Sequence, residues 1–238
     1  RDNLPGLEFR RVLFRSATIE KAIPILQKGD PWKFVDINDA VQAVCEGQTA
    51  AKAGIDIALM DWLTKWLGLP LYQFWGLDAK KAPQTTFSIG IDTMDMVKTK
   101  VQEADPYPLL KIKMGKDNDE EVLTAVRSVT DKTLRVDANE GWKDKELALR
   151  KVEWLAKNGV DLVEQPMPAD MLEETAWVKE RAPIPIIADE SVKTSRDIPR
   201  LAEAFDGINI KVDKAGGLQE SLRMIWMARS LGLKIMLG

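Results

Sequence analysis

The pattern of hydrophobic and polar positions changes near Thr85. Over residues 17–77 apolar side chains recur at helical spacing, and the run TAAKAGIDIALMDWLTKWLGLP ends in Gly68 and Pro70, two residues that stop helices. Beyond Thr85, short β-rich runs alternate with amphipathic stretches such as DEEVLTAVRSV and KELALRKVEWLAKNG. We therefore predict a helical first part, followed by alternating strands and helices.

Seven short apolar runs are the strand candidates. They are TTFSIG, LLKIKMG, TLRVDAN, DLVEQP, IPIIADE, GINIKVD and LKIMLG. Helical crossovers between consecutive strands make those strands parallel. An eight-fold barrel of about 250 residues uses about 31 residues per strand–helix unit, whereas the polar strand ends here recur every 22 to 27 residues. The predicted fold class is α/β, with a compact parallel-stranded barrel.

A charged residue ends each of five consecutive strand candidates. These residues are Lys113, Asp137, Glu164, Asp189 and Lys211. The loops at the carboxyl ends of parallel barrel strands converge on one site, so we expect these side chains to meet. Asp137 alone would as readily be a turn or helix-capping residue. Three carboxylates on consecutive strands instead favour a metal site, and oxygen ligands without Cys or His favour Mg²⁺ over zinc.

Lys111 and Lys113 are two residues apart on one strand candidate. Side chains i and i+2 of an extended strand point to the same face, while Leu110, Ile112 and Met114 supply its apolar flank. For an isolated K-x-K, lysines that simply reach solvent at a strand end are the plainer interpretation. The carboxylates that end the following strands favour a functional pair.

Composition narrows the chemistry further. The chain has 238 residues, a formal net charge of -3, no histidine, and Cys45 as its single cysteine. The lack of histidine removes Ser–His and Cys–His nucleophile pairs and His-based zinc sites, so acid–base chemistry falls to carboxylates, lysines or tyrosines. With no basic field and no bilayer-length apolar run, we expect neither nucleic-acid nor membrane binding. Cysteine usage fits the cytoplasm, where we expect the protein.

The strand-end motifs resemble the barrel motifs of the enolase superfamily, in the subgroup of muconate-lactonizing enzymes, o-succinylbenzoate synthases and dipeptide epimerases. They are KIKMG, RVDANEGW, LVEQPMP, IIADES and NIKVDKAGG, in that order. The resemblance implies a (β/α)7β barrel with an N-terminal α+β capping domain. We expect residues 17–80 to be a remnant of the capping domain with its linker helices. Residues 81–238 are expected to form a barrel domain that is truncated within strand seven.

The resemblance also implies catalytic roles. Lys113 resembles the family's general base, and Lys111 resembles the neighbour that lowers its proton affinity, since like-charge crowding and partial burial disfavour the ammonium form. Lys211 matches the opposing acid or base. One lysine would remove a proton α to a carboxylate, and the other would return it on the opposite face of an enediolate intermediate.

The same resemblance implies the metal ligands and the substrate class. Asp137, Glu164 and Asp189 match the family's three Mg²⁺ ligands. TTFSIG and DANEGW are most similar to dipeptide epimerases of the L-Ala-D/L-Glu type, so the expected substrate is a dipeptide such as L-Ala-L-Glu. Weaker candidates for substrate binding are Thr86, which a strand more often uses structurally, and Lys214, placed in a Gly-rich loop.

Two other classes of function stay open. One is the chemistry of o-succinylbenzoate synthase or a muconate-type cycloisomerase, which needs a single base and a leaving group. The other is a catalytically silent barrel that serves as a binding module, although the five charged strand-end residues argue against silence. We expect the intact protein to be a homo-oligomer that binds a small-molecule substrate, and this chain alone to be inactive because an eighth strand is lacking.

Residues 1–16 fit no amphipathic period. Leu7–Ser16, LEFRRVLFRS, back-translates to CTG GAG TTC AGA CGT GTG CTC TTC CGA TCT, a widely used sequencing-library adapter. We hypothesise that residues 1–16 are a non-native leader and exclude them from the expected fold; a natural basic leader is the alternative. Reading the coding DNA decides between them, because clearly different codons would exclude an adapter origin.

Overall fold

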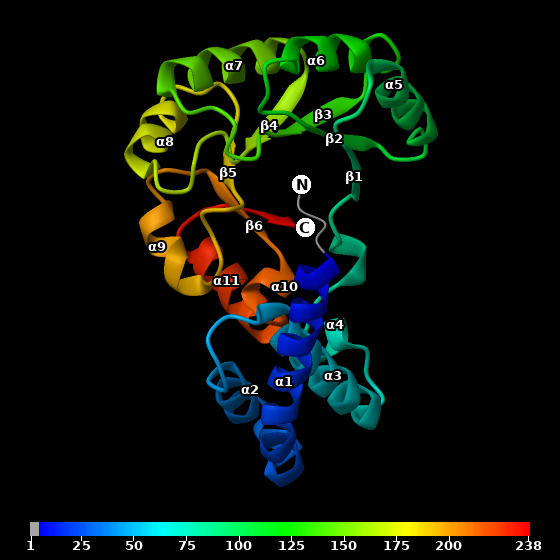
Figure 1. Ribbon diagram of the computed structural model, residues 1–238, viewed down its shortest axis with the longest axis vertical. Coiled ribbons are helices and arrows are strands. Elements are labelled where there is room, and N and C mark those ends of the chain that lie inside the picture. Colours follow the sequence, from blue (N-terminus) through cyan, green and yellow to red (C-terminus); the bar gives the residue numbers. More distant parts are fainter. Residues whose placement is uncertain (1–4) are drawn as a thin grey trace. The chain divides into compact units, whose positions relative to one another are not determined.

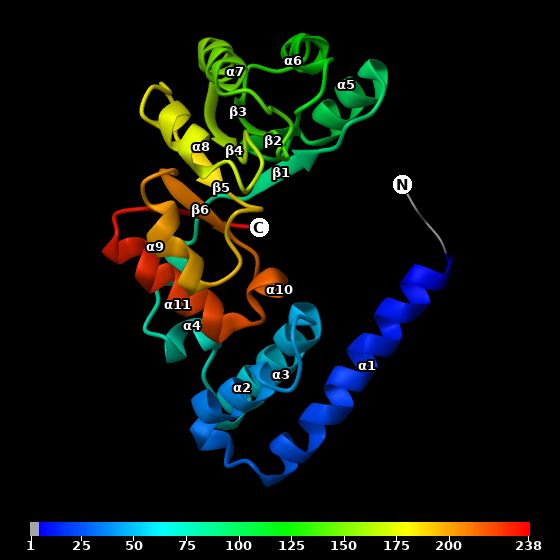
Figure 2. The same cartoon turned by 60° about the vertical axis from the view of Figure 1, so that its left-hand side comes forward.

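The computed structural model describes residues 5–238, with side chains from Arg15 onward. The chain divides into two compact units. The first comprises the residues up to 82, residues 210–226 and Gly238, and the second comprises residues 83–209 and 227–237 (Figures 1 and 2). The predicted domain boundary between residues 80 and 81 lies close to the division between the two units at residues 82 and 83.

The first unit is helical, as predicted. Its α-helices are α1 (Pro5–Lys28), α2 (Phe34–Gln42), α3 (Thr49–Leu67), α4 (Leu71–Phe74), α10 (Val212–Ala215) and most of α11 (Leu218–Ser230), with short 3₁₀ turns at Pro31–Lys33 and Ala79–Lys81. Helices α1, α2 and α3 pack on one another (Figure 2). Helix α3 ends where expected, because Gly68 takes a φ of 67° and closes the last turn through its N–H. No described helix combines the length and apolarity that crossing a membrane requires.

Helix α1 begins earlier than predicted. The expected start was near Ala17, but the backbone is helical from Pro5, through most of the proposed leader. Residues 1–4 of that leader lie outside the described part of the chain. Among the described side chains of α1, Ala22 is buried and packs with Ile37 and Val41 of α2.

Residues 210–226 group with the N-terminal helices and not with the rest of the expected 81–238 domain. Asp56 of α3 is buried, and its carboxylate accepts hydrogen bonds from the backbone N–H and the side-chain amide of Gln219, at 3.0 and 2.6 Å. Gln42 of α2 donates to the carbonyl of Gly216 at 2.8 Å. These side-chain contacts link the start of α11 to α2 and α3.

All seven predicted strands are present and form one sheet in sequence order. They are β1 (Thr86–Ile89), β2 (Leu109–Lys113), β3 (Thr133–Asp137), β4 (Val160–Glu164), β5 (Ile186–Ala188), β6 (Gly207–Ile210) and β7 (Lys234–Leu237). Strands β1 to β6 pair in parallel. The sheet is curved, and the connecting helices lie along its outer side (Figure 1). These are α5 (Met94–Glu103), α6 (Asp119–Arg127), α7 (Lys145–Lys157), α8 (Leu172–Lys179) and α9 (Ile198–Leu201).

Burial along the strands explains this arrangement. In β2, Leu110 and Ile112 are fully buried, whereas Lys111 and Lys113 on the other face are only partly buried. Strands β5 and β6 are buried at every position, as expected where helices and neighbouring strands cover both faces of a parallel sheet. The polar residues of the sheet are thereby confined to its inner face and to the ends of its strands.

Candidate metal and acid–base site

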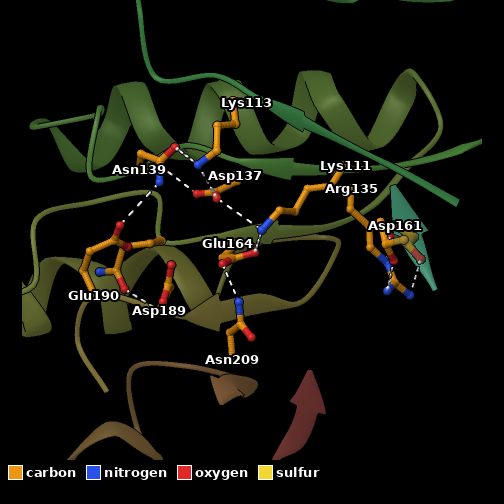
Figure 3. Close-up of polar contacts among 12 residues, drawn as sticks. Lys111, Lys113, Arg135, Asp137, Asn139, Asp161, Glu164, Asp189, Glu190 and Asn209 are labelled. Carbon is orange, nitrogen blue, oxygen red and sulfur yellow. Dashed lines mark hydrogen bonds and ion pairs between the residues drawn. The ribbon is translucent and has the colours of Figure 1, made fainter. Parts of the chain in front are cut away.

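Three buried carboxylates meet at the carboxyl ends of β3, β4 and β5. Asp137 and Glu164 are the last residues of β3 and β4 and are paired in register, while Asp189 directly follows β5. One carboxylate oxygen from each lies within 4.8 Å of the others. The structure thus brings together the three residues that the sequence placed at one end of the barrel (Figure 3).

Lys111 and Lys113 extend from β2 toward these carboxylates. Lys111 Nζ lies 2.9 Å from Glu164 Oε2 and 3.3 Å from Asp137 Oδ2. Lys113 Nζ lies 3.3 Å from the same Asp137 oxygen and donates to Asn139 Oδ1 at 2.9 Å. The Lys113 side chain is 40% exposed and that of Lys111 only 13%. Lys113 is therefore the more accessible of the two lysines to a molecule in the site.

The charges in the site influence one another strongly. Burial lowers the pKa of Lys111, but the carboxylates of Glu164 and Asp137 outweigh burial and leave that pKa above its ordinary value. Burial, followed by the charge of Asp137, raises the pKa of Glu164 against the opposing effects of Lys111 and Asn209. Lys111 accordingly stays a cation, and Lys113 keeps a positively charged neighbour on its own strand.

The donor set fits a hard divalent cation. Each ligand candidate offers carboxylate oxygens, and neither histidine nor cysteine belongs to the cluster. Oxygen-only sets of this kind suit Mg²⁺ or Ca²⁺ and not zinc. Buried carboxylates that lie this close repel one another unless cations are near, and a divalent ion would supply that charge.

Several further polar residues in the site had no assigned role in the sequence interpretation. Asn209 on β6 is buried and donates to Glu164 Oε1 at 2.8 Å. The backbone N–H of Asn139 donates to Asp137 Oδ1 at 3.1 Å, and its side-chain amide reaches Glu190 at 3.4 Å. Burial and the neighbouring Asp189 raise the pKa of Glu190. Asn209 could have been found by the i, i+2 rule, since it lies on β6 two residues before Lys211. Asn139 could not, because it follows the end of β3 and has a φ of 44°.

Two of the predicted lysines belong to the first unit. Lys211 directly follows β6, as expected for a strand-end residue, and its catalytic role stays a prediction. Lys214 was expected in a loop, but it lies in the single turn of α10, which ends at Gly216 with a φ of 88°.

Thr86 does not reach the site from its position on β1. It is the first residue of that strand and pairs with Leu109, the first residue of β2, whereas the carboxylates stand at the opposite ends of their strands. Its hydroxyl accepts a hydrogen bond from Arg135 at 3.1 Å, and Arg135 also pairs with Asp161 at 3.3 Å. These contacts agree with a structural role for Thr86 and give no support to contact between Thr86 and a substrate.

Comparison with known proteins identifies relatives for both parts of the chain. Residues 94–238 match the family described as enolase C-terminal domain-like, and residues 13–76 match the N-terminal domain of mandelate racemase and muconate lactonizing enzyme. The chain is 45% identical over 219 residues to an L-Ala-D/L-Glu epimerase of Bacteroides thetaiotaomicron. The matched region covers 92% of this chain and 57% of that protein.

Solved structures show the same likeness. A substrate-liganded complex of the L-Ala-D/L-Glu epimerase from Bacillus subtilis superposes with a TM-score of 0.86 at 30% identity, covering 94% of this chain and 65% of that one. A dipeptide epimerase from Enterococcus faecalis V583, complexed with Mg and the dipeptide L-Leu-L-Tyr, superposes with a TM-score of 0.84 at 30% identity. That superposition covers 94% of this chain and 66% of the epimerase. The chain thus spans between half and two thirds of the length of these proteins.

Proposed function

Because the chain belongs to the enolase superfamily, in the family of mandelate racemase and muconate lactonizing enzyme, we propose that the full-length protein is a dipeptide epimerase. It moves a proton off and back onto the α-carbon of the residue that carries the free carboxylate. The observation that carries this proposal is the lysine pair of β2, set within 3.3 Å of buried carboxylates that can hold a cation.

The substrate pair we assign is L-Ala-L-Glu and L-Ala-D-Glu. A relative with 45% identity bears the name L-Ala-D/L-Glu epimerase, and the Enterococcus faecalis relative was crystallised with a different dipeptide. What these relatives share is the class of substrate, a dipeptide.

Asp137, Glu164 and Asp189 would hold Mg²⁺ in this proposal. The bound ion supplies positive charge that makes the α-proton of a neighbouring carboxylate easier to remove. The protein's part is to keep three carboxylate oxygens close together in a buried place, with Asn209 orienting Glu164 through a hydrogen bond of 2.8 Å. The orientation of the ligands is thus prepared before any cation binds.

Lys113 is the base on one face of the α-carbon. Lys111, which stays a cation, lies on the same face of the same strand and places a second positive charge beside it. Asn139 holds the Lys113 amine by a hydrogen bond of 2.9 Å, which limits where the amine can point. Lys211 is proposed as the acid or base on the opposite face, so that removal by one lysine and return by the other inverts the stereocentre through an enediolate.

The test is exchange of the α-proton in D₂O, followed by proton NMR, with Lys113→Ala and Lys211→Ala in the full-length protein. Each variant should lose epimerisation yet still exchange the proton of one epimer, and the two variants should act on opposite epimers. Lys100→Ala, which removes a partly exposed lysine of α5 that pairs with Asp92, is the control and should epimerise normally. Unimpaired inversion in Lys211→Ala would instead leave Lys113 as sole base and favour the one-base cycloisomerase alternative.

A further inference from the structure

Gln165 joins two of the proposed metal ligands. It follows Glu164 in the chain and is fully buried. Its amide nitrogen donates to the Met167 carbonyl and to Ser191 Oγ, each at 2.8 Å. Its amide oxygen accepts from the backbone N–H groups of Asp189 and Ser191, at 2.9 and 3.2 Å. We propose that Gln165 is a positioning residue that fixes Asp189 relative to Glu164, an inference that rests on the proposed metal site.

The side-chain amide of Gln165 is used to its full hydrogen-bonding capacity. A glutamine amide has two N–H donors and an oxygen that accepts two hydrogen bonds, and all four are engaged. Rotating the amide by 180° would place its NH₂ group against two backbone donors and its oxygen against a carbonyl. One orientation of the amide is therefore strongly favoured, and in that orientation the amide is hydrogen-bonded to the turn that follows β5.

The backbone of Gln165 is held as firmly as its side chain. Its N–H donates to the Ile187 carbonyl at 2.8 Å, and its own carbonyl accepts from Glu140 N–H at 2.9 Å. Its φ is +38°, in the left-handed region that non-glycine residues seldom adopt. Such a conformation persists only where the surroundings hold it. The consequence is a short link between the ligands, with a peptide bond to Glu164 and one hydrogen bond to Asp189.

A second group of hydrogen bonds, at the other ends of the strands, provides a matched control. Arg127 donates to four backbone carbonyls near the starts of β3 and β4, those of Asn158, Thr130, Lys132 and Gly159, at 2.9, 3.3, 2.7 and 3.1 Å. Like Gln165 it joins neighbouring strands through four hydrogen bonds, but it stands away from the carboxylates. Losing Arg127 should lower stability without moving a ligand.

The experiment compares Gln165→Met with Arg127→Met in the full-length protein. Calorimetric titration measures Mg²⁺ affinity, and hydrogen exchange measures protection of the Asp189 and Ser191 amides in the metal-free protein. Partners that orient metal ligands are typically worth about 10- to 100-fold in affinity, so Gln165→Met should bind Mg²⁺ at least about tenfold more weakly. It should also exchange those two amides faster. Arg127→Met should lower the Tm and change neither quantity.

The outcomes separate this inference from the proposed function. If Gln165→Met keeps wild-type Mg²⁺ affinity and amide protection while its Tm falls, Gln165 is only structural and the inference is wrong. If the wild-type protein itself binds no Mg²⁺, the proposed metal site fails and the inference falls with it. Should Gln165→Met not fold, Ser191→Ala removes one acceptor of the amide nitrogen and should weaken Mg²⁺ binding by about fivefold; unchanged affinity there would also overturn the inference.

Discussion

Replacing Lys111 with methionine tests the electrostatics of the site directly. Lys111 Nζ lies 2.9 Å from Glu164 Oε2 and 3.3 Å from Asp137 Oδ2, and the two carboxylate side chains are 0% and 1% exposed. Methionine keeps much of the apolar length of lysine and removes the charge. In the metal-free protein this change removes the lysine paired with Glu164 and leaves Asp137 paired with Lys113 at 3.3 Å.

The expected cost follows from the geometry. At an effective dielectric constant of about 20, unit charges at these separations attract by roughly 5–6 kcal/mol per pair. Removing water from buried charges offsets much of that attraction, and loss of one partner of a buried ion pair costs about 3–5 kcal/mol. Each 1 kcal/mol shifts the Tm of a protein this size by about 2–4 °C. We expect metal-free Lys111→Met to unfold about 6–20 °C below wild type.

Calorimetric unfolding with and without Mg²⁺ is the assay. Added Mg²⁺ should raise the Tm of Lys111→Met by more than that of wild type, because the ion replaces the missing positive charge. Lys65→Met is the control, since Lys65 pairs with Asp61 at 2.7 Å on the surface, with side chains 75% and 55% exposed. Exposed pairs contribute about 0–1 kcal/mol. A metal-free Lys111→Met as stable as this control would refute the proposed buried ion pairs.

Two further changes probe the ligands and the loops that carry them. Glu164→Gln should weaken Mg²⁺ binding in a calorimetric titration, because it removes one charge from the shared site; unaltered affinity would exclude the proposed ligand set. Gly115→Ala should destabilise the protein by at least about 2 kcal/mol more than Gly47→Ala in thermal unfolding. Both glycines have positive φ, but an added Cβ at Gly115 would come 2.0 Å from the Ala138 carbonyl oxygen, whereas the one at Gly47 would meet nothing within 4 Å. Equal stabilities of the two variants would contradict the close approach of the loops after β2 and β3.

The strand framework was predictable because its signal is local. Strand periodicity, helical crossovers and the helix stop at Gly68 all depend on residues a few positions apart. The same local rules placed Lys111 and Lys113 on one face of β2 and put a carboxylate at the end of each of the next three strands. The parallel register then brings Lys113 beside Asp137 and Asp137 beside Glu164.

Other features of the site are set by contacts between residues far apart in the chain. Asn209 and Glu164 are 45 positions apart, and Gln165 and Ser191 are 26 positions apart. Neither asparagine nor glutamine carries a sequence signal for its partner, because either side chain can donate or accept almost anywhere. The start of α1 at Pro5 was also missed, since excluding a segment on the origin of its codons says nothing about its helical propensity.

The order of strands and helices and the residues at the strand ends could be predicted from the local pattern of residues, because periodicity and chain direction set both. Which side chains contact one another could be seen only in the folded protein. Tertiary structure placed Thr86 against Arg135 at the far end of β1, grouped residues 210–226 with the N-terminal helices, and set Gln165 between Glu164 and Asp189. The physical reason is that these contacts depend on sheet register and on the exclusion of water from buried polar groups, and both arise only when distant segments come together.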